Sequence, residues 1–532
     1  MDNELRQQQL LHDRGICVVI PTYNNAGTID AVVHQTLEEC MDVIVVNDGS
    51  TDDTSAILHA IEGITIVEYT QNRGKGYALK RGFQRALEMG FAYAITLDGD
   101  GQHYPHDISL FLEANRQHPG ALIIGSRTLE GVDRPKGSSF ANKFSNFWFY
   151  VQTGRRLPDT QTGYRLYPLK KLYGLRLLTS RYEAELELLV FASWHGVELV
   201  PINIEVYYPP RDQRVSHFRP GMDFTRISVL NTILCFLAVV YGLPLRLFRW
   251  LANVTRTVYS LLFVLFFCCC VFTPIVWLYV KIGKVTEQKR RNLHRLIYHA
   301  TRFVMLRHGI PGTRFTYKVA DGVDFSDPGS ECGVAISKPS VVICNHQSHI
   351  DLACQLIFTP NIIFLTNQWV WHNPIYGLII RHAEFYPVAN ATPHSDRWSE
   401  NATPHSDHWS ENGIDELMPK LRSLVERGYS IAVYPEGTRS RDCRIGRFHQ
   451  GAFHIAEQLG LDVVPMYLYG PGRILPPRTY HLRKGPIYIE VGDPIPLSKL
   501  RQMGDTKKQA SQLRKHYIEK YEQIANRIEQ DV

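Results

Sequence analysis

Short apolar runs alternate with amphipathic stretches from residue 16 to about residue 210. Each apolar run has the length of one buried strand, and four of them lie at Ile16–Pro21, Val43–Val46, Ala92–Leu97 and Ala121–Gly125. The segments between them carry helical periodicity, as in Gly76–Met89. Strands that alternate with helices predict βαβ units and a mostly parallel sheet. We therefore expect one α/β domain over residues 1–225.

A second α/β pattern begins at about residue 335. Its apolar runs lie at Ser340–Cys344, Ile431–Tyr434 and Val463–Leu468. They predict a second α/β domain over residues 283–532, with its core at about 335–500. The eleven residues from Asn390 to Glu400 are repeated almost unchanged from Asn401 to Glu411. Two polar copies are too few for a repeat fold, so we expect a lengthened surface loop at 390–411.

Two long apolar stretches, Ile227–Leu245 and Thr257–Val280, separate the two patterns. Each is long enough to cross a bilayer as a helix. They predict a membrane-associated helical hairpin over residues 226–282. A re-entrant or interfacial pair and a pair of soluble core helices remain alternatives. Basic residues are denser on the outer flanks than in the connection, which carries Arg246, Arg249 and Arg256. This bias predicts an inner (cytoplasmic) membrane location with both large domains facing the cytoplasm.

Composition narrows the class of protein. The chain has 532 residues, a hydrophobic fraction of 44% and a net charge of +6. The length implies more than one domain. The positive charge is modest and has no block-like basic arm, so we expect no nucleic-acid partner and an anionic membrane surface instead. The ten cysteines show no metal-ligand spacing, and the polar N-terminus does not resemble a signal peptide.

Acidic residues follow successive strands of the first pattern. Asp48 comes directly after the second apolar run, and Asp98 and Asp100 come after a later one. Ligands of open α/β sheets gather at the carboxyl ends of the strands. Paired carboxylates supply oxygen ligands for the divalent cation, Mg²⁺ or Mn²⁺, that a nucleotide diphosphate requires. A single acidic turn is usually only a turn, but acidic turns after two strands of one domain predict a nucleotide site.

Residues 16 to about 220 resemble family 2 glycosyltransferases near the dolichyl-phosphate mannose synthase branch. The matching stretches are IPTYNNAGTI, VNDGSTDDT, NRGKGYALKRG, LDGDGQHYP, GSR and DTQTGYRLYP. The resemblance implies a GT-A fold and an inverting, metal-dependent transfer from a nucleotide sugar. Asp48 would bind the nucleotide, and Asp98, Asp100 and Gln102 would surround the cation, with Asp100 also counted as catalytic.

The same resemblance makes Arg127 and Arg165 candidates for phosphate contacts, although structural ion pairs are equally open for both. If the acceptor is a hydroxyl, a carboxylate must take its proton. Asp159, Glu183 and Glu185 are candidates for that base, and the two glutamates have the alternative of facing solvent on a helix.

The second pattern carries a histidine and an aspartate at a spacing that suits catalysis. His346 follows an apolar strand, and Asp351 comes five residues later in NHQSHID. At the entry to a helix this spacing lets the carboxylate bond one imidazole nitrogen while the other nitrogen faces a substrate hydroxyl. About ninety residues on, YPEGTRS follows another strand. Glu436, Gly437, Thr438 and Arg439 offer amides, a hydroxyl and a guanidinium for a phosphate.

Residues 335 to about 500 resemble the glycerol-phosphate and lysophosphatidic acid acyltransferase family. The matching stretches are NHQSHID, NPIYG, FYPV, YPEGTRS and VVPMYLYG. The resemblance implies His346 as general base, Asp351 as its partner, acyl-ACP or acyl-CoA as donor, and residues 436–439 holding the acceptor or helping to form the site. The second block lacks the family's usual lysine, and the duplicated loop replaces a region that touches the acceptor in related enzymes. Arg397 and His408 are the nearest candidates there.

These features predict a bifunctional, membrane-associated enzyme of bacterial glycolipid assembly, with a nucleotide sugar, an acyl thioester and a lipid acceptor as partners. Clusters for aryl-polyene and flexirubin-type lipids pair these two activities, so this resemblance indicates that setting. The alternative is a 1-acylglycerol-3-phosphate acyltransferase whose glycosyltransferase-like domain is accessory and does not catalyse. A scaffold with both sites inactive is a third hypothesis.

Overall fold

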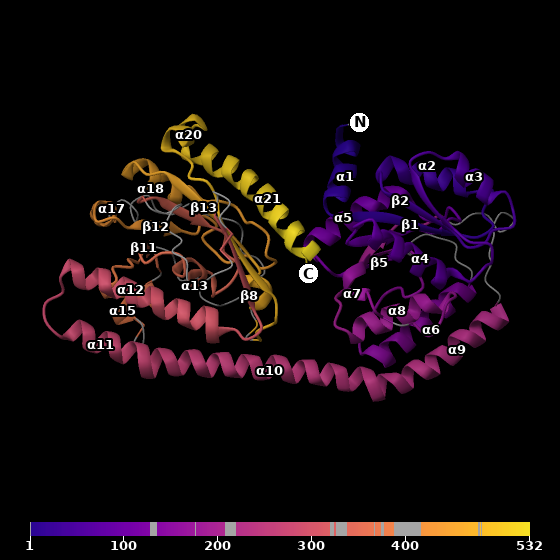
Figure 1. The fold of residues 1–532 in the computed structure, drawn as a ribbon, viewed down its shortest axis with the longest axis horizontal. Helices are drawn as coiled ribbons and strands as arrows, with labels where there is room; N and C mark the ends of the chain where they lie inside the picture. The colour runs from indigo at the N-terminus through magenta and orange to yellow at the C-terminus, as the bar shows by residue number, and fades with distance from the viewer. Residues whose placement is uncertain are drawn as a thin grey trace. The chain divides into compact units, whose positions relative to one another are not determined.

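The computed structural model describes residues 2–127, 136–175, 177–207, 220–319, 324–325, 338–366, 368–373, 377–387, 417–476, 479 and 481–531. They form two compact units. The first comprises Met1–Trp250 with Asn526–Val532, and the second comprises Leu251–Ala525. Each unit is built around its own sheet (Figure 1). The cysteines that the structure describes are free thiols.

The first unit alternates strands and helices through most of its length. Its strands are β1 Ile16–Thr22, β2 Val43–Asn47, β3 Ile64–Glu68, β4 Tyr93–Thr96, β5 Leu122–Arg127, β6 Arg165–Pro168 and β7 Leu199–Ile204. Its helices are α1 Asp2–Asp13, α2 Ile29–Glu39, α3 Thr54–Ala60, α4 Lys75–Glu88, α5 Ile108–Gln117, α6 Lys136–Thr153, α7 Leu169–Leu172, α8 Glu183–Trp194 and α9 Pro220–Leu237. The sheet order is β3-β2-β1-β4-β6-β5-β7.

Alternation along β1 divides the core of this unit between the two faces of the sheet. Ile16, Val18 and Ile20 pack with side chains from α1, α2, α3 and α5. Cys17 and Val19 point to the other face, where α4, α6, α8 and α9 contribute. Successive strand residues point to opposite faces, so a strand covered on both sides must be apolar throughout. This explains why β1 is buried at every position.

The second unit has a sheet of order β11-β12-β10-β13-β14-β8-β9. Its strands are β8 Arg314–Val319, β9 Asp324–Phe325, β10 Val341–Cys344, β11 Ile362–Phe364, β12 Ser430–Val433, β13 Val463–Tyr469 and β14 Pro486–Val491. Its helices include α11 Thr273–Lys281, α12 Glu287–Phe303, α13 Asp351–Leu356, α14 Gln368–Trp371, α15 Gly377–His382, α17 Met418–Glu426, α18 Gly451–Leu459, α19 Pro471–Ile474, α20 Leu497–Gln502 and α21 Thr506–Asp531.

The predicted strands agree with the structure in kind and closely in position. β1, β2, β4 and β5 lie at the four apolar runs of the first pattern, and β10, β12 and β13 lie at the three of the second. The pairs β1–β2, β1–β4, β10–β12 and β10–β13 are parallel. The prediction of two α/β folds is therefore confirmed.

The prediction of a helical hairpin is wrong, because the chain does not turn between the two apolar stretches. Helix α10, Leu243–Phe266, runs straight through the expected connection. Together with α9, α11 and π-helical turns at Ala238–Gly242 and Phe267–Phe272 it gives one continuous helix, Thr225–Lys281. Residues 246–256 contain no glycine or proline and are mostly good helix formers, so nothing local ends the helix there. By length and composition, this helix is the one among the described residues that could cross a membrane.

The duplicated loop at 390–411, with Arg397 and His408, lies outside the described residues.

Candidate active sites

Asp48 lies at the carboxyl edge of the first sheet, directly after β2. Its two carboxylate oxygens accept hydrogen bonds from the Tyr69 hydroxyl at 2.7 Å and from the backbone N–H groups of Arg73 and Gly74, both at 2.8 Å. The side chain thus fixes the loop that leads into α4. Asp48 is only 3% exposed, so in this structure its side chain mainly stabilises the loop at the carboxyl edge of the sheet.

A buried lysine reaches the first of the two acidic residues after β4. Lys75, at the start of α4, places its ammonium 2.7 Å from Asp98 Oδ1 and 3.1 Å from Glu185 Oε2. Burial by itself raises the pKa of the Asp98 carboxyl, but the charge and the hydrogen bond of Lys75, together with nearby His103 and Arg165, hold the pKa below its usual value. A Cβ at Gly163 would lie 2.6 Å from Asp98 Oδ2. Only glycine fits over this ion pair.

Asp100 is placed differently from Asp98. Its Oδ1 accepts the backbone N–H of Gln102 at 3.0 Å. Burial, followed by the negative charge of Asp98, raises the pKa of Asp100 to about 6. The structure thus brings Asp98, Asp100 and Gln102 together in one loop, at the same sheet edge as Asp48, because β2 and β4 both run parallel to β1.

The donor set of this loop fits a divalent cation that is also held by its substrate. No group of three or more His, Cys, Asp or Glu side chains that could hold a metal occurs in the part of the chain that the structure describes. Mg²⁺ commonly binds to one or two carboxylates and completes its shell with phosphate oxygens and waters. Asp98 and Asp100 meet that requirement. Glu183 Oε2 and Glu185 Oε1 are also buried without a hydrogen-bond partner.

The two arginines predicted for phosphate contacts both form hydrogen bonds with other groups of the protein. Arg127 forms a two-point pair with Asp159, with Nε and Nη2 at 2.6 and 3.0 Å from the carboxylate oxygens. Arg165 is fully buried and donates to the carbonyls of Thr160 and Glu185. A guanidinium without exposed surface offers no face to a phosphate, so the structure favours the structural alternative for Arg165. The pairing also occupies Asp159, one of the candidate bases.

Three features of this edge were missed or misjudged at the sequence level. Lys75 belongs to the matching stretch NRGKGYALKRG but was given no role. His103 is a buried neutral imidazole, and burial lowers its pKa to about 4. Glu183 and Glu185 do not face solvent, since both are less than a tenth exposed. Glycine on both sides of Lys75 is the signal that could have indicated its close approach to the acidic loop.

The second unit places the predicted histidine and aspartate in direct contact. His346 follows β10, and Asp351 begins α13. His346 Nδ1 lies 2.8 Å from Asp351 Oδ2. Asp351 is completely buried, whereas the His346 side chain is 21% exposed. Among the described residues, none forms a hydrogen bond with the other imidazole nitrogen, Nε2, so this nitrogen is available to a substrate proton. This is the arrangement of a general base with its orienting carboxylate.

Asp351 organises the loop as well as the imidazole. The same oxygen, Oδ2, accepts the backbone N–H groups of Gln347 and Ser348. Asn345, just before the histidine, exchanges two hydrogen bonds with the backbone of Leu468 on β13. The imidazole itself stacks on the Tyr434 ring, with centroids 4.1 Å apart. Each neighbour of His346 thus restricts its position.

Glu436 supports the base from the second motif. One carboxylate oxygen accepts the backbone N–H of His346 at 2.8 Å, and the other accepts that of Gly446 at 2.6 Å. Burial raises the pKa of Glu436 to about 7. Of the two roles predicted for residues 436–439, Glu436 therefore helps to form the site, because both of its oxygens are occupied by the chain.

The remaining residues of the second motif lie in the open. Gly437, Thr438 and Arg439 are exposed, and Gly437 has a φ of +67°, which favours glycine. Ser440, next in the chain, donates its backbone N–H to the His346 carbonyl at 2.7 Å. Arg439 contacts His349, and burial together with the arginine charge lowers the pKa of that imidazole. An exposed guanidinium beside the base suits an anionic acceptor.

The acidic sheet edge and the histidine–aspartate pair lie in two domains, each of which matches a transferase family. Residues 17–171 match the glycosyl transferase family 2 model, and residues 328–469 match the acyltransferase model. The chain belongs to glycosyl transferase family 2 and joins to that domain a domain of the acyltransferase family. The expected GT-A and acyltransferase folds are confirmed with it.

Individual relatives resemble one domain each. An undecaprenyl-phosphate mannosyltransferase of Micrococcus luteus is 30% identical over 30% of this chain and 70% of its own. A chloroplastic 1-acyl-sn-glycerol-3-phosphate acyltransferase of Brassica napus, BAT2, is 30% identical over 30% of this chain and 42% of its own. The crystal structure of the acyltransferase PlsC from Thermotoga maritima aligns with a TM-score of 0.37 at 16% identity, covering 51% of this chain and 97% of that one.

Proposed function

We propose that this chain is a bifunctional, membrane-associated enzyme of bacterial glycolipid biosynthesis. One domain moves a sugar from a nucleotide sugar, and the other moves an acyl group from acyl-ACP or acyl-CoA to a hydroxyl. The observation that carries the proposal is the presence of two separate polar sites in one chain. One is the acidic edge at Asp98 and Asp100, and the other is the His346–Asp351 pair.

In the sugar-transfer half, Asp48 and its loop would bind the nucleotide, and Asp98, Asp100 and Gln102 would hold Mg²⁺ or Mn²⁺. A cation held there would supply positive charge to neutralise the leaving diphosphate. The reaction inverts the anomeric centre and uses a lipid-linked acceptor. If the acceptor is a hydroxyl, Glu183 or Glu185 takes its proton, because both carboxylates are buried and retain an unpartnered oxygen, and Glu185 also lies beside Lys75.

In the acyl-transfer half, His346 Nε2 removes the proton of the acceptor hydroxyl. The oxygen attacks the thioester carbonyl directly, the carbon–sulfur bond breaks, and the thiolate leaves with the transferred proton. Asp351 holds the imidazole in the required tautomer and stabilises its charged form. Thr438 and Arg439 bind the head of the acceptor, and Glu436 keeps the base in place.

The setting follows from the lipid character of both substrates. We place the enzyme at the inner membrane with both domains on the cytoplasmic side, where nucleotide sugars and acyl thioesters are made. An aryl-polyene or flexirubin-type lipid is our favoured product class. The names of the two relatives support lipid substrates in general, since one is named for undecaprenyl phosphate and the other for 1-acyl-glycerol-3-phosphate.

A second candidate function is a 1-acylglycerol-3-phosphate acyltransferase with an accessory first domain. The observation that favours it is the Lys75–Asp98 ion pair, which already neutralises one of the two cation ligands. The exposed Arg439 would then bind the phosphate of the acceptor.

The test is made on the purified full chain reconstituted in vesicles. A panel of labelled nucleotide sugars is offered with a polyprenyl phosphate, with Mg²⁺, Mn²⁺ or a chelator. Labelled acyl-CoA and acyl-ACP are offered with lipid acceptors that carry a hydroxyl. We expect cation-dependent release of the nucleotide from one sugar donor, and acyl transfer from one thioester.

Asp100→Asn and His346→Ala serve as each other's control. Asp100→Asn should abolish sugar transfer and leave acyl transfer intact, and His346→Ala should do the reverse. Absence of nucleotide-sugar binding and turnover with every donor, while acyl transfer persists, would reject the bifunctional proposal in favour of the second candidate.

A further inference from the structure

The apolar helical run Thr225–Lys281 is exposed along most of its length. Only 6% of its most apolar 18-residue window is buried, so the run is not the core helix of a soluble domain. Large apolar side chains that point away from the protein include Phe236, Val239, Leu243, Phe248, Leu262 and Leu278, all more than half exposed. Such a continuous apolar surface requires a partner.

Within the first unit, the polar side of the run is already in use. Asn231 is 3% exposed and receives a hydrogen bond from Gln152, and Tyr241 pairs with the His195 imidazole at 3.0 Å. Arg246 donates to the carbonyl of Thr153, the last residue of α6. The side that faces the unit therefore holds the amide, the phenol and the charge, and the outward side keeps the apolar residues.

The second unit repeats this division. Arg256 donates to the carbonyl of Pro311 at 2.9 Å and to Asn253 at 2.8 Å. The Thr257 hydroxyl accepts the backbone N–H of Leu482, and Ser260 is 3% exposed. Two of the three arginines that interrupt the hydropathy of the sequence, Arg246 and Arg256, are thus turned toward protein carbonyls.

The contacts on the inner side argue against a transmembrane orientation. A helix of 57 residues is about 85 Å long at a rise of 1.5 Å per residue, whereas the hydrocarbon core is about 30 Å thick, so only part of the run could cross it. A crossing at either apolar stretch would carry the protein packed against it, at Asn231 or at Ser260, into the bilayer. A helix that lies in the plane of the interface buries only one face, which is the arrangement found in both units.

Charge identifies the partner. Residues 224–286 contain no aspartate or glutamate. Lys281 and Lys284 are exposed at the end of the run, and the Lys281 ammonium lies 5.6 Å from the centre of the Trp277 ring. Paired tryptophan and lysine are typical of the level of the lipid headgroups. A surface that is apolar along its length and purely basic at its end complements anionic lipid.

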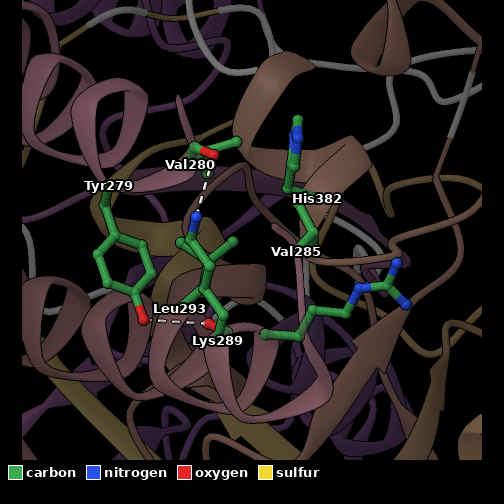
Figure 2. Close-up of a pocket in the computed structure, with 7 residues that line it drawn as sticks. Tyr279, Val280, Val285, Lys289, Leu293 and His382 are labelled. Carbon is green, nitrogen blue, oxygen red and sulfur yellow. Dashed lines mark hydrogen bonds between the residues drawn. The ribbon is translucent and has the colours of Figure 1, made fainter. Parts of the chain in front are cut away.

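The end of the run is fixed by the protein. Figure 2 shows the small pocket where Lys289 of α12 reaches back to the last turn of α11. Its ammonium donates to the carbonyls of Val280 and Ile282, at 3.1 and 2.6 Å, and lies over the Tyr279 ring. The helix therefore ends at Lys281, and the chain turns into α12 without a further apolar segment.

We propose that the run Thr225–Lys281 is an in-plane docking surface for a bilayer that contains anionic lipids, and that it does not cross the membrane. The residues before and after it then remain on one side of the membrane. The inference deepens the proposed function, since it gives the lipid substrates a common surface, but the docking itself requires neither catalytic site.

The first test is flotation of the full chain with vesicles of phosphatidylcholine, with and without phosphatidylglycerol. We expect binding that is stronger with phosphatidylglycerol and weakened by salt. We expect binding to weaken by about tenfold or more for each of the substitutions Phe236→Glu, Phe248→Glu and Leu262→Glu, because each removes a large apolar contact, and most in the triple variant. The exposed residues Leu110 and Leu178, outside the run, give matched controls as Leu110→Glu and Leu178→Glu.

The second test measures depth in the bilayer. A spin label is incorporated as an unnatural amino acid at residue 236, 248, 262 or 278, one at a time, so that the native thiols stay unchanged. We expect each label, in either unit, at a shallow depth, about 5–10 Å below the headgroups. A gradient that places one label at the bilayer centre would overturn the in-plane orientation.

Labels shielded from both lipid and water in a stable dimer would show that a second copy covers the face, and would also overturn the proposal. The two proposals fail separately. Flotation and shallow depth without any transfer activity would leave the docking surface standing and reject the proposed function. Transfer activity without flotation would support the proposed function and reject the docking surface.

Discussion

Asp351 fixes the orientation of the His346 imidazole, the proposed base of acyl transfer. It is fully buried, and a single oxygen receives the imidazole and two backbone N–H groups. Asp351→Asn would place an amide where this oxygen stands and would favour the wrong imidazole tautomer. We expect acyl transfer to fall by about 10³-fold or more. Sugar transfer by the same preparation is the control, and a variant with nearly normal acyl transfer would contradict the assigned role.

Glu436 makes a prediction about pH and stability. Its folded pKa of about 7 lies above the ordinary value of 4.5, so the folded chain keeps a proton that the unfolded chain releases between pH 4.5 and 7. Stability from this group is therefore present at low pH and declines as the pH rises to 7, by an amount on the order of 3 kcal/mol.

Urea unfolding of the second unit, followed through the loss of acyl transfer at several pH values, measures this slope. Glu436→Gln stays neutral at every pH, so the difference in stability between wild type and variant should change between pH 5 and 7 and level off above. Glu426→Gln, at an exposed glutamate of the same unit, should leave the slope unchanged. A slope that is the same in Glu436→Gln and wild type would refute the linkage.

At the scale of single residues, the sequence predicted contacts between residues that are close along the chain and missed contacts between residues that are far apart along it. The spacing of His346 and Asp351 is short enough for a helix entry to bring them into contact. Glu436 binds backbone N–H groups, one of them ninety residues away, and no residue type marks a backbone donor. The roles of Arg127 and Arg165 stayed open for a related reason, since burial decides between a phosphate and a carbonyl and the motif does not show burial.

At the scale of elements, the start of α4 meets the loop after β4 through Lys75. Lys75→Met would leave Asp98 and Glu185 buried without their counter-charge, and losing one partner of a buried pair costs about 3–5 kcal/mol. We expect a lower unfolding temperature for the first unit. Mg²⁺ or Mn²⁺ should stabilise the variant more than the wild type, because the cation replaces the missing positive charge at Asp98.

Lys80→Met is the matched control, because Lys80 is exposed on the same helix. It should unfold like the wild type, with and without the cation. If Mn²⁺ shifts the unfolding of Lys75→Met no more than it shifts that of Lys80→Met, Asp98 does not lie at the cation site.

The elements themselves were predictable where one physical preference dominates. β1 and β10 are buried at every position, and their positions follow directly from the apolar runs that such burial requires. The hairpin was predicted from hydropathy, which describes how polar each residue is and not the direction in which its side chain points. Arg246, Arg249 and Arg256 read as a polar connection in the sequence, whereas the structure turns Arg246 and Arg256 toward carbonyls and keeps the helix intact.

At the scale of the whole molecule, joining two transferases in one chain raises the question of which acts first. If the sugar is attached before the acyl group, a chain that lacks only acyl transfer should accumulate a lipid that already carries the sugar. If acylation comes first, a chain that lacks only sugar transfer should accumulate an acylated lipid without sugar. The chemistry of the accumulated species therefore reports the order.

We expect sugar transfer to come first, because the acceptor motif after Glu436 is open and basic, as an already assembled polar head would require. Cells that carry His346→Ala should then accumulate a glycosylated lipid that lacks one acyl chain. Cells with Asp100→Asn should contain neither that lipid nor the final product. Mass spectrometry of lipid extracts, compared with cells that lack the chain altogether, distinguishes these species. Accumulation of an acylated, sugar-free lipid in the Asp100→Asn cells would reverse the order.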